Sequence, residues 1–375
     1  MKKLPIGIEL FCGCGGISTG FLDAGLPVAA GFDIDRKSIE AYDYNHNYRQ
    51  SRGYVADLAI TSGTSILEMA GLNKVDFVIG GPPCQPFSIV GKRLGSDDMR
   101  SQLVEHFGRL VGELNPKAVF FENVPNLASV NNGEHLNALV RALRDLRYSV
   151  RLEVVTAAEY GVPQVRRRLL LVAIKGRTQV VFPEPTHGPS NALKPFVTAK
   201  DALDDLPPAG EFGECGVHNH EPTAHTPDML QRFATLEPGK RERRSFHDRL
   251  HPDRPSYTLR AGTGNFSPLR PIHYRHDRVI TVRESARLQG FGDEFVWPDW
   301  VPRLQQYRQV GNAVAPPVAA TVARTIAEQV EWDLKPDALK GNSFTRPEAR
   351  TMTDAERKAL RMVRIRGASL GRGSL

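Results

Sequence analysis

The chain has 375 residues, of which 41% are hydrophobic and 24% charged, values typical of globular proteins. This length predicts roughly two or three domains with a substantial core. The sequence contains no apolar run of about 18 residues and no signal-peptide pattern, which argues against a membrane span and against export. Four cysteines argue against a disulfide scaffold, so we expect a reduced, cytoplasmic setting.

The net charge is +7 at pH 7, from 49 Lys and Arg against 42 Asp and Glu. Such an excess suits a polyanionic partner such as nucleic acid, although many cytoplasmic proteins share it. Much of the excess lies in residues 333–375, where we expect a basic tail that is disordered or forms a short helix near 356–366.

Short apolar runs alternate with amphipathic stretches over the first 175 residues. The apolar runs predict strands at Ile6–Phe11, Val28–Phe32, Val75–Ile79, Ala118–Phe121, Ser149–Val155 and Leu169–Ile174. The amphipathic stretches predict helices at Ser18–Ala24, Arg36–Tyr44, Ser101–Leu114 and Glu134–Leu146. This alternation predicts an α/β fold with a doubly wound, mixed but mostly parallel sheet, which binds ligands at the carboxyl ends of its strands.

The texture of the sequence changes near residue 176. Residues 176–275 are rich in Pro, Gly, His and Arg and predict a smaller, loop-rich unit. Helical patterns return in residues 276–332, interrupted at Gly311–Pro317. We therefore expect a catalytic and cofactor-binding domain in 1–175, a recognition region in 176–275, a C-terminal segment in 276–332 and a basic tail in 333–375.

The first predicted strand runs into Phe11-Cys12-Gly13-Cys14-Gly15-Gly16, and a predicted helix follows. Glycines there let the backbone approach a ligand, and the helix N-terminus offers free N–H donors. Asp33 ends the second strand about 20 residues after Gly13, the spacing at which an acidic residue binds ribose hydroxyls in dinucleotide-type folds. Asp57 follows another apolar stretch. Together these residues predict an adenosine-containing cofactor, although Ser18 replaces the third glycine of the dinucleotide fingerprint.

A later strand runs into the segment Gly80–Ser88, in which prolines flank Cys84. The prolines fix a rigid turn and place the cysteine just beyond the carboxyl end of the strand. A thiolate is a strong nucleophile, but an ordinary thiol pKa near ~8.5 must be lowered by nearby positive charge. A lone cysteine is more often a small buried hydrophobe. The Pro-Pro-Cys-Gln-Pro setting favours a reactive thiol.

Glu122 and an arginine cluster end two further segments. Glu122 follows Phe120-Phe121, so we expect partial desolvation to raise its pKa and let it carry a proton at neutral pH; a helix-capping role is the alternative. In the run Arg166-Arg167-Arg168, strand alternation places the first and third side chains on one face. They could bind a phosphate or a base edge, or form a solvated basic edge.

Taken in order, these segments resemble the DNA (cytosine-5)-methyltransferases over residues 5–330. The matching segments are Glu9–Gly16, Gly31–Asp35, Ala56–Leu58, Gly80–Ser88, Phe121–Val124, Gln164–Arg168, Arg254–Gly262 and Gly311–Pro317. The resemblance implies a prokaryotic enzyme, from a restriction–modification system or solitary. It would transfer the methyl group of S-adenosyl-L-methionine to C5 of a flipped-out cytosine in a short double-stranded DNA sequence.

The resemblance also implies roles for individual residues. The Cys84 thiolate would attack C6 of the base, Glu122 would stabilise the adduct at ring N3, and Arg168 would hold the base with support from Arg166. The implied cofactor contacts are Phe11, Gly13, Gly15, Asp33, Ile34, Asp57, Leu58, Pro83, Asn312 and Ala313. Relatives often carry an adenine-stacking aromatic residue where this chain has Ile34, a difference that bears on affinity rather than on activity.

In this family the DNA sequence is read between the Gln164–Arg168 and Arg254–Gly262 segments. Here that stretch contains the basic cluster Lys240–His251, which either contacts phosphates and guanine edges or forms an ordinary solvated turn. The expected DNA-binding residues are Gln85, Ser88, Arg93, Lys240, Arg241, Arg243 and Arg244. We expect no metal, because the spacing of Cys215, His218, His220 and His225 matches no ordinary zinc finger.

Three other functions are compatible with parts of this pattern. A tRNA cytosine-5 methyltransferase would share the fold, but a dedicated recognition region favours DNA. A catalytically silent DNA-binding protein would not need Cys84, Glu122 and Arg168, and a thiol hydrolase would need a histidine partner for Cys84. We expect a monomer that binds double-stranded DNA in the cytoplasm and does not bind a membrane. In a restriction–modification system, its partner would be an endonuclease that cleaves the same site.

Overall fold

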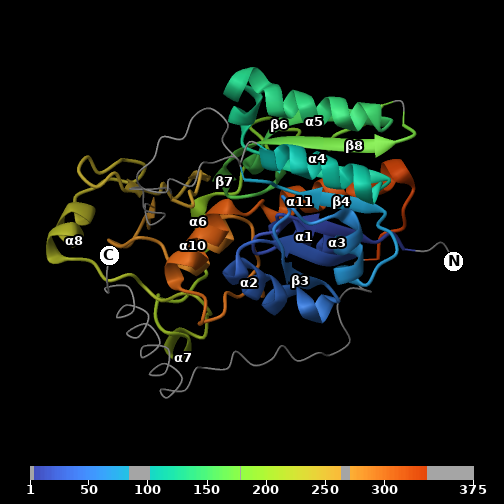
Figure 1. Ribbon diagram of the computed structural model, residues 1–375. Coiled ribbons are helices and arrows are strands. Elements are labelled where there is room, and N and C mark those ends of the chain that lie inside the picture. The colour runs from blue at the N-terminus through green and yellow to red at the C-terminus, as the bar shows by residue number, and fades with distance from the viewer. Residues whose placement is uncertain (1–3, 84–101, 178, 263–270, 336–375) are drawn as a thin grey trace, which may run out of the picture.

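The computed structural model describes residues 4–83, 102–177, 179–262 and 271–335. Its centre is a seven-stranded sheet with strand order β3-β2-β1-β4-β5-β8-β6 (Figure 1). The strands are β1 (Gly7–Leu10), β2 (Val28–Asp33), β3 (Arg52–Val55), β4 (Phe77–Gly80), β5 (Ala118–Asn123), β6 (Tyr148–Thr156) and β8 (Arg167–Lys175). The first five strands in this order are parallel, while β8 is antiparallel to both β5 and β6. The predicted mixed, mostly parallel sheet is confirmed.

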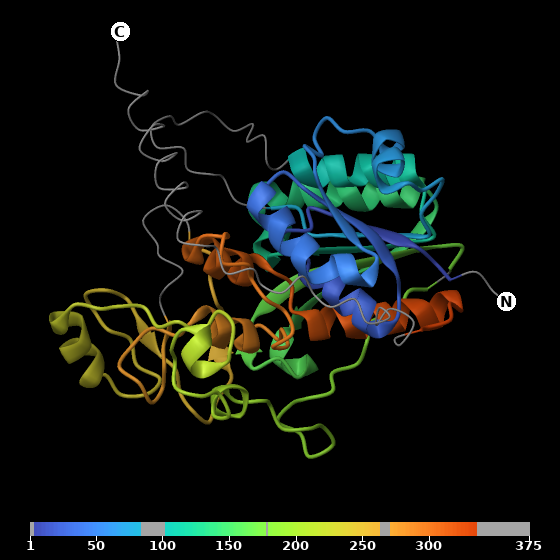
Figure 2. The same cartoon turned by 90° about the horizontal axis from the view of Figure 1, so that it is seen from below.

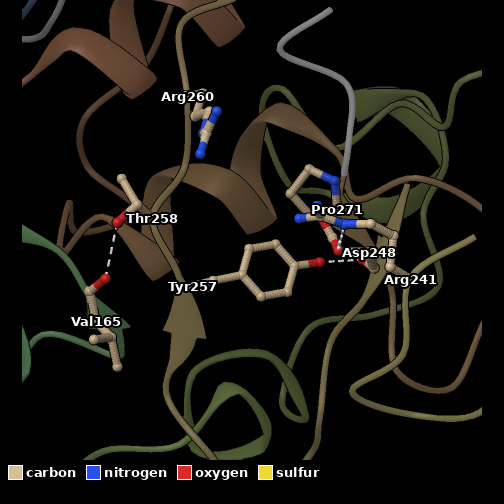
Figure 3. A pocket seen from close by; sticks show the side chains of 7 residues that line it. All are labelled: Val165, Arg241, Asp248, Tyr257, Thr258, Arg260 and Pro271. Carbon is tan, nitrogen blue, oxygen red and sulfur yellow. Dashed lines mark hydrogen bonds and ion pairs between the residues drawn. The ribbon is translucent and has the colours of Figure 1, made fainter. Parts of the chain in front are cut away.

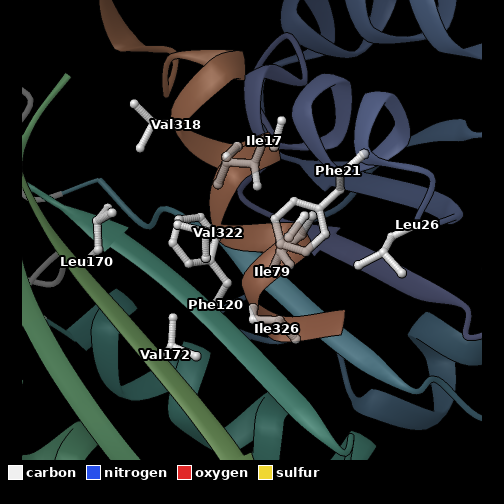
Figure 4. Packing of buried hydrophobic residues seen from close by; sticks show 14 of the residues in the cluster. Ile17, Phe21, Leu26, Ile79, Phe120, Leu170, Val172, Val318, Val322 and Ile326 are labelled. Atoms are coloured by element: carbon white, nitrogen blue, oxygen red, sulfur yellow. The ribbon is translucent and has the colours of Figure 1, made fainter. Parts of the chain in front are cut away.

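Helices cover both faces of the sheet. Apolar side chains of α1 (Gly16–Ala24) and α11 (Pro316–Val330) pack on one face, and those of α4 (Gln102–Leu114) and α5 (Glu134–Asp145) pack on the other. Figure 4 shows the first of these layers, in which side chains of α1 and α11 meet Phe120 and Leu170 of the sheet. The remaining helices of this part are α2 (Arg36–His46) and α3 (Gly63–Ala70). This packing matches the doubly wound arrangement expected from the sequence.

The contact between α1 and α11 brings together the two ends of the described chain. Gly20 has no side chain, and a Cβ there would lie only 2.4 Å from the carbonyl oxygen of Pro316. Likewise, a Cβ on Gly16 would lie 2.4 Å from the carbonyl oxygen of Val314. Because glycine permits this close approach, the segment before α11 lies directly against the glycine-rich turn after β1.

The rest of the chain forms a loop-rich region beside the sheet (Figures 1 and 2). Its elements are short: β7 (Gln164–Val165), α6 (Ala199–Leu203), α7 (Phe212–Cys215), α8 (Pro227–Ala234), β9 (Asp248–Arg249), β10 (Ser256–Tyr257), β11 (Pro271–Ile272), α9 (Val282–Leu288) and α10 (Arg303–Asn312). A separate apolar cluster around Trp297, Phe291 and Leu250 stabilises it. In the part of the chain that the structure describes, no helix has both the length and the apolar character needed to span a bilayer.

Candidate active site

The glycine-rich turn after β1 has a backbone that leaves room for a ligand. Phe11, Gly13 and Gly15 have φ angles of 57°, 54° and 93°, and a Cβ on Gly13 would meet nothing within 4 Å. A Cβ on Gly15 would instead lie 2.4 Å from Cε1 of His46. The two glycines therefore have different roles, because Gly13 faces open space while Gly15 permits close packing.

Asp33 holds this turn from the end of β2. Its carboxylate oxygens accept hydrogen bonds from the backbone N–H of Gly13 at 2.9 Å and of Asp35 at 2.8 Å. Burial raises the pKa of the Asp33 carboxyl. Asp33 thus shapes the turn in addition to any contact with ribose.

Three further predicted cofactor residues lie on or near the same edge of the sheet. Ile34, directly after β2, is 66% exposed, so its side chain is accessible to a ligand. Asp57 is exposed and its carboxylate accepts a hydrogen bond from Ala59 N at 3.0 Å. The Leu58 side chain is buried in the core, so only its backbone can face a ligand.

The last predicted cofactor residues, Asn312 and Ala313, join this edge through the α1–α11 contact. Asn312 is exposed and is the last residue of α10. Two residues later, the carbonyl oxygen of Val314 lies against Gly16, because a Cβ there would be only 2.4 Å away. Cys14 also reaches the end of α10, with its Sγ 3.9 Å from Gln309 O. Burial raises the pKa of the Cys12 and Cys14 thiols, so neither is poised as a thiolate nucleophile.

The carboxylate and arginine predicted to be catalytic, Glu122 and Arg168, meet at the carboxyl end of β5. Arg168 Nε lies 2.7 Å from Glu122 Oε1, and both side chains are largely buried. This approach is close enough for an ion pair, but it is not aligned as a hydrogen bond, and Glu122 Oε1 has no hydrogen-bond partner among the described residues. A buried carboxylate oxygen with an unused lone pair is a binding group for a donor on a substrate.

The turn towards Cys84 is fixed by a residue to which the sequence pattern assigned no role. Asn123 donates a hydrogen bond from Nδ2 to the carbonyl oxygen of Pro82 at 3.0 Å. Gly81 lies against Glu122, because a Cβ there would be 3.0 Å from Glu122 Oε2. Pro83 is exposed. The predicted nucleophile Cys84 and the predicted DNA contacts Gln85, Ser88 and Arg93 lie outside the described residues.

Arg166 points away from solvent into the protein. Its guanidinium donates to the carbonyl oxygens of Leu259 at 2.9 Å, Gly311 at 2.8 Å and Ala313 at 3.3 Å. Burial lowers its pKa to about 9, which leaves it charged at neutral pH. Arg166 is therefore a positioning residue that ties β7 to the Arg254–Gly262 and Gly311–Pro317 segments, rather than a group that touches the base.

Gln164, two residues before Arg166, also links this segment to distant parts of the chain through buried hydrogen bonds. Its Nε2 donates to Leu288 O at 3.0 Å and to Gln289 Oε1 at 2.7 Å, and its Oε1 accepts from Leu259 N at 3.0 Å. The side chains of Gln164 and Arg166 are both buried, while those of Val165 and Arg167 are exposed. Exposure thus alternates from Gln164 to Arg167, while Arg168 is partly buried and contacts Glu122.

Beside Val165 lies a cavity of about 310 Å³ that is lined by residues of the loop-rich region. Figure 3 shows Val165 and Thr258 on one side of it and Arg241, Asp248 and Pro271 on the other, with Tyr257 between them. Arg241 forms a bidentate ion pair with Asp248, with Nε–Oδ1 at 2.6 Å and Nη2–Oδ2 at 3.1 Å. Arg241 therefore braces this wall through its ion pair, and it is exposed like Lys240, Arg243 and Arg244.

The four residues weighed as zinc ligands have separate partners. His220 contacts Thr281 Oγ1 at 2.9 Å and Pro207 O at 3.0 Å, and His225 Nε2 accepts from Val279 N at 3.2 Å. Cys215 lies 3.4 Å from Gly210 O, and His218 stacks on Phe212. Within the described ranges, no three His, Cys, Asp or Glu side chains are grouped as metal ligands.

Comparison with known proteins identifies the class of protein to which this fold and site belong. The sequence profile of the C-5 cytosine-specific DNA methylases matches residues 6–328. The chain belongs to this family and is a DNA (cytosine-5)-methyltransferase, as its sequence pattern predicted.

The curated relatives agree over most of their length. The chain is 36% identical over 374 residues to the type II methyltransferase M.XorII of Xanthomonas oryzae, covering 86% of this chain and 84% of that protein. It is 34% identical over 334 residues to the type II methyltransferase M1.HphI of Haemophilus parahaemolyticus, covering 85% and 86%.

Solved structures agree on the fold. A DNA modification methyltransferase encoded within an Escherichia coli prophage matches with a TM-score of 0.72 and 29% identity, covering 87% of this chain and 99% of that one. The Dnmt2 methyltransferase of Schizosaccharomyces pombe matches with a TM-score of 0.62 at 17% identity, covering 88% and 100%, which is a likeness of fold alone.

Proposed function

We propose that this enzyme methylates C5 of a cytosine flipped out of double-stranded DNA, through a covalent bond between Cys84 and C6 of the base. The observation that carries this proposal is the buried Glu122–Arg168 ion pair at the carboxyl end of β5, beside the turn that leads to Cys84. Glu122 Oε1 lies close to Arg168 Nε but accepts no hydrogen bond from the described residues. A stacked base could not reach a carboxylate this deeply buried, so the base must leave the helix.

The chemistry explains why this pair is needed. C5 of cytosine is a poor nucleophile until a thiolate adds to C6 and turns the ring into an enamine. Glu122 would give or share a proton at N3 as electron density moves onto the ring, and Arg168 would orient the carboxylate and the base. After C5 has gained the methyl group, a base removes the C5 proton and the Cys84–C6 bond breaks to restore the thiolate.

S-Adenosyl-L-methionine would supply the methyl group when bound at the edge formed by the Phe11–Gly16 turn, Asp33, Ile34 and Asn312. The open space at Gly13 and the exposed apolar surface of Ile34 fit a nucleoside there. The carboxylate of Asp33, anchored by two backbone N–H groups, keeps lone pairs for ribose hydroxyls.

We further propose that residues 176–275 read a short DNA sequence and that the chain acts in the cytoplasm as the methylating half of a type II restriction–modification system. Support comes from the relatives named as type II methyltransferases and from the exposed basic residues beside the cavity. In that setting, an endonuclease that cleaves the same sequence would be its functional partner. Residues 1–175 and 276–332 would together carry catalysis, and we expect a monomer.

Trapping the covalent intermediate tests this proposal. A duplex in which the target cytosine is replaced by 5-fluorocytosine has no C5 proton to lose, so the enzyme should remain bonded to it through denaturing electrophoresis. We expect a cofactor-dependent, shifted band from the wild-type protein and none from Cys84→Ser. A shifted band with Cys84→Ser, or none with wild-type protein that methylates ordinary duplex, would refute the covalent route.

A further inference from the structure

Residues 240–248 form a hairpin in the loop-rich region. Arg241 and Asp248 face each other in an isolated antiparallel bridge, reinforced by their bidentate ion pair. Glu242 N donates to His247 O at 2.8 Å and Phe246 N donates to Glu242 O at 3.0 Å, which closes the tip. The hairpin therefore has a fixed stem and a defined tip.

Phe246 occupies this tip in a costly conformation. Its φ is 58°, in the left-handed region where a side chain other than Gly, Asn or Asp is strained, and 51% of the residue is exposed. Glycine would relieve the strain, and a polar residue would avoid exposing an aromatic ring to water. Since neither the backbone nor the core calls for phenylalanine here, its ring points to a contact outside the chain.

The tip is held rigidly from beneath. The Glu242 carboxylate is buried and accepts hydrogen bonds from Arg244 N at 3.1 Å and Ser245 N at 2.5 Å, as well as from the Ser245 hydroxyl. Although burial opposes ionisation, these hydrogen bonds lower the pKa of Glu242 to about 2. The neighbouring His247 ring packs on Phe233 with centroids 5.1 Å apart, in the small apolar cluster under the hairpin. At the tip of the hairpin, Arg243, Arg244 and Phe246 are exposed, as are Lys240 and Arg241 on the stem.

The hairpin also stands in the right place to meet DNA. Its stem residues Arg241 and Asp248 form one wall of the cavity whose other wall includes Val165 of β7 (Figure 3). Val165 precedes Arg166, and Arg168 follows on the strand that carries the contact to Glu122. Val165 and Arg168 are three residues apart, roughly 10 Å along an extended chain. A duplex whose cytosine reaches Glu122 would therefore pass near this hairpin.

We propose that Phe246 contacts the DNA bases next to the target and is a determinant of sequence preference, while Arg243 and Arg244 bind the flanking phosphates. This inference rests on the proposed function. An exposed aromatic ring next to two arginines suits this task, because the ring offers apolar contact to base faces and thymine methyl groups and the guanidinium groups offer charge. A preorganised tip also avoids the entropic cost of ordering a loop on binding.

The test compares Phe246→Gly with Phe212→Ala, which removes a similarly exposed aromatic ring (47%) from α7 in the same region. The target is first mapped by bisulfite sequencing of plasmid methylated by the wild-type enzyme. Binding is then measured by fluorescence anisotropy, with one 25-base-pair duplex that carries the mapped target and one that carries the same bases shuffled. Glycine removes backbone strain, so Phe246→Gly should melt no lower than the wild type and unfolding cannot explain its effect.

We expect Phe246→Gly to lower the preference for the target duplex by about tenfold or more, with an unchanged salt dependence. The double change Arg243→Ala with Arg244→Ala should weaken binding to both duplexes alike and reduce the salt slope by about 2. Phe212→Ala should behave as the wild type.

If Phe246→Gly keeps the wild-type preference and methylation rate within twofold, as Phe212→Ala does, Phe246 is not a base contact and the inference is wrong. If the wild-type enzyme methylates no preferred DNA sequence, the proposed function fails first, and the inference fails with it. The plasmid assay on the wild type separates these two failures.

Discussion

Arg166 Nη2 donates a 2.8 Å hydrogen bond to the carbonyl oxygen of Gly311, a residue from the far end of the described chain. Arg166 directly precedes β8, whose second residue Arg168 contacts Glu122, while Gly311 precedes Asn312 at the end of α10. One buried guanidinium therefore links the segment that leads to the Glu122–Arg168 pair with the segment proposed to close the cofactor site.

Replacement of Arg166 should lower the stability of the protein and weaken cofactor binding. Arg166→Met leaves three buried carbonyl oxygens with fewer donors, so we expect the free energy of unfolding to fall by about 2–4 kcal/mol. We also expect a higher KM for S-adenosyl-L-methionine. Urea unfolding and initial-rate kinetics measure the two effects. The exposed neighbour offers the control Arg167→Met, which should change neither; equal effects from both substitutions would contradict the positioning role.

Glu122→Gln tests the carboxylate directly. An amide cannot deliver a proton to ring N3, so we expect the methylation rate to fall about 10²-fold or more while S-adenosyl-L-methionine still binds. Single-turnover methylation of duplex DNA measures the rate, and isothermal titration measures the cofactor affinity. Glu134→Gln on α5, in the first turn of an outer helix, should keep the wild-type rate. A Glu122→Gln enzyme with a wild-type rate would remove Glu122 from the mechanism.

Substitutions of Gly13 and Gly15, the two glycines of the turn after β1, should affect different properties. Gly13→Ala adds a methyl group that touches nothing within 4 Å, so beyond a backbone cost of about 1 kcal/mol its main effect should be weaker binding of S-adenosyl-L-methionine. Gly15→Ala drives a Cβ against His46 and Tyr42, so its main effect should be lower stability. Thermal melting and cofactor titration of both variants check this. The opposite pattern would mean that the ligand does not lie over Gly13.

Glu9 predicts a specific pH dependence of stability. Its buried carboxylate accepts a hydrogen bond from Ser18 N at 2.8 Å, and burial raises its pKa from 4.5 to about 8. Between these two values the folded chain keeps a proton that the unfolded chain has lost, so the contribution of Glu9 to stability falls as pH rises from about 4.5 to 8.

Glu9→Gln should remove this dependence, because the amide oxygen still accepts from Ser18 and nothing titrates. The variant should gain stability relative to the wild type as pH rises from 5.5 to 8, on the order of ~1 kcal/mol per pH unit. Urea unfolding at several pH values measures the difference. A difference that is constant across this range would show that Glu9 has an ordinary pKa.

The sequence predicts the sheet well where burial dictates the pattern and poorly where it does not. Strands such as β1 and β5 are buried along their whole length, so their apolar runs identify them. The edge strand β3 has four residues with mixed burial, and neither it nor helix α3 is among the elements predicted. The helices predicted at Arg36–Tyr44 and Glu134–Leu146 match α2 and α5 within two residues at their ends.

In the candidate site, too, the sequence predicts local features better than those that depend on the fold. Residue type and order single out Glu122, Arg168 and Asp33 as candidates, because each lies at the end of a strand, where the sequence pattern can be read locally. The tasks of Gln164, Asn123 and Arg166 depend on carbonyl oxygens brought in by the fold, such as those of Leu288, Pro82 and Gly311. The brace formed by Arg241 and Asp248 likewise appears only in three dimensions, since Arg241 reads in the sequence as one more basic residue of its cluster.

The most direct test of the central claim is methyl transfer from labelled S-adenosyl-L-methionine to unmethylated plasmid DNA, followed by nucleoside analysis. Parallel reactions contain bulk tRNA in place of DNA, or Cys84→Ala in place of the wild-type enzyme. The account predicts 5-methyldeoxycytidine from the wild type, at one short sequence, with no transfer by Cys84→Ala and none to tRNA. Label in another nucleoside, label in tRNA alone, or undiminished transfer by Cys84→Ala would contradict it.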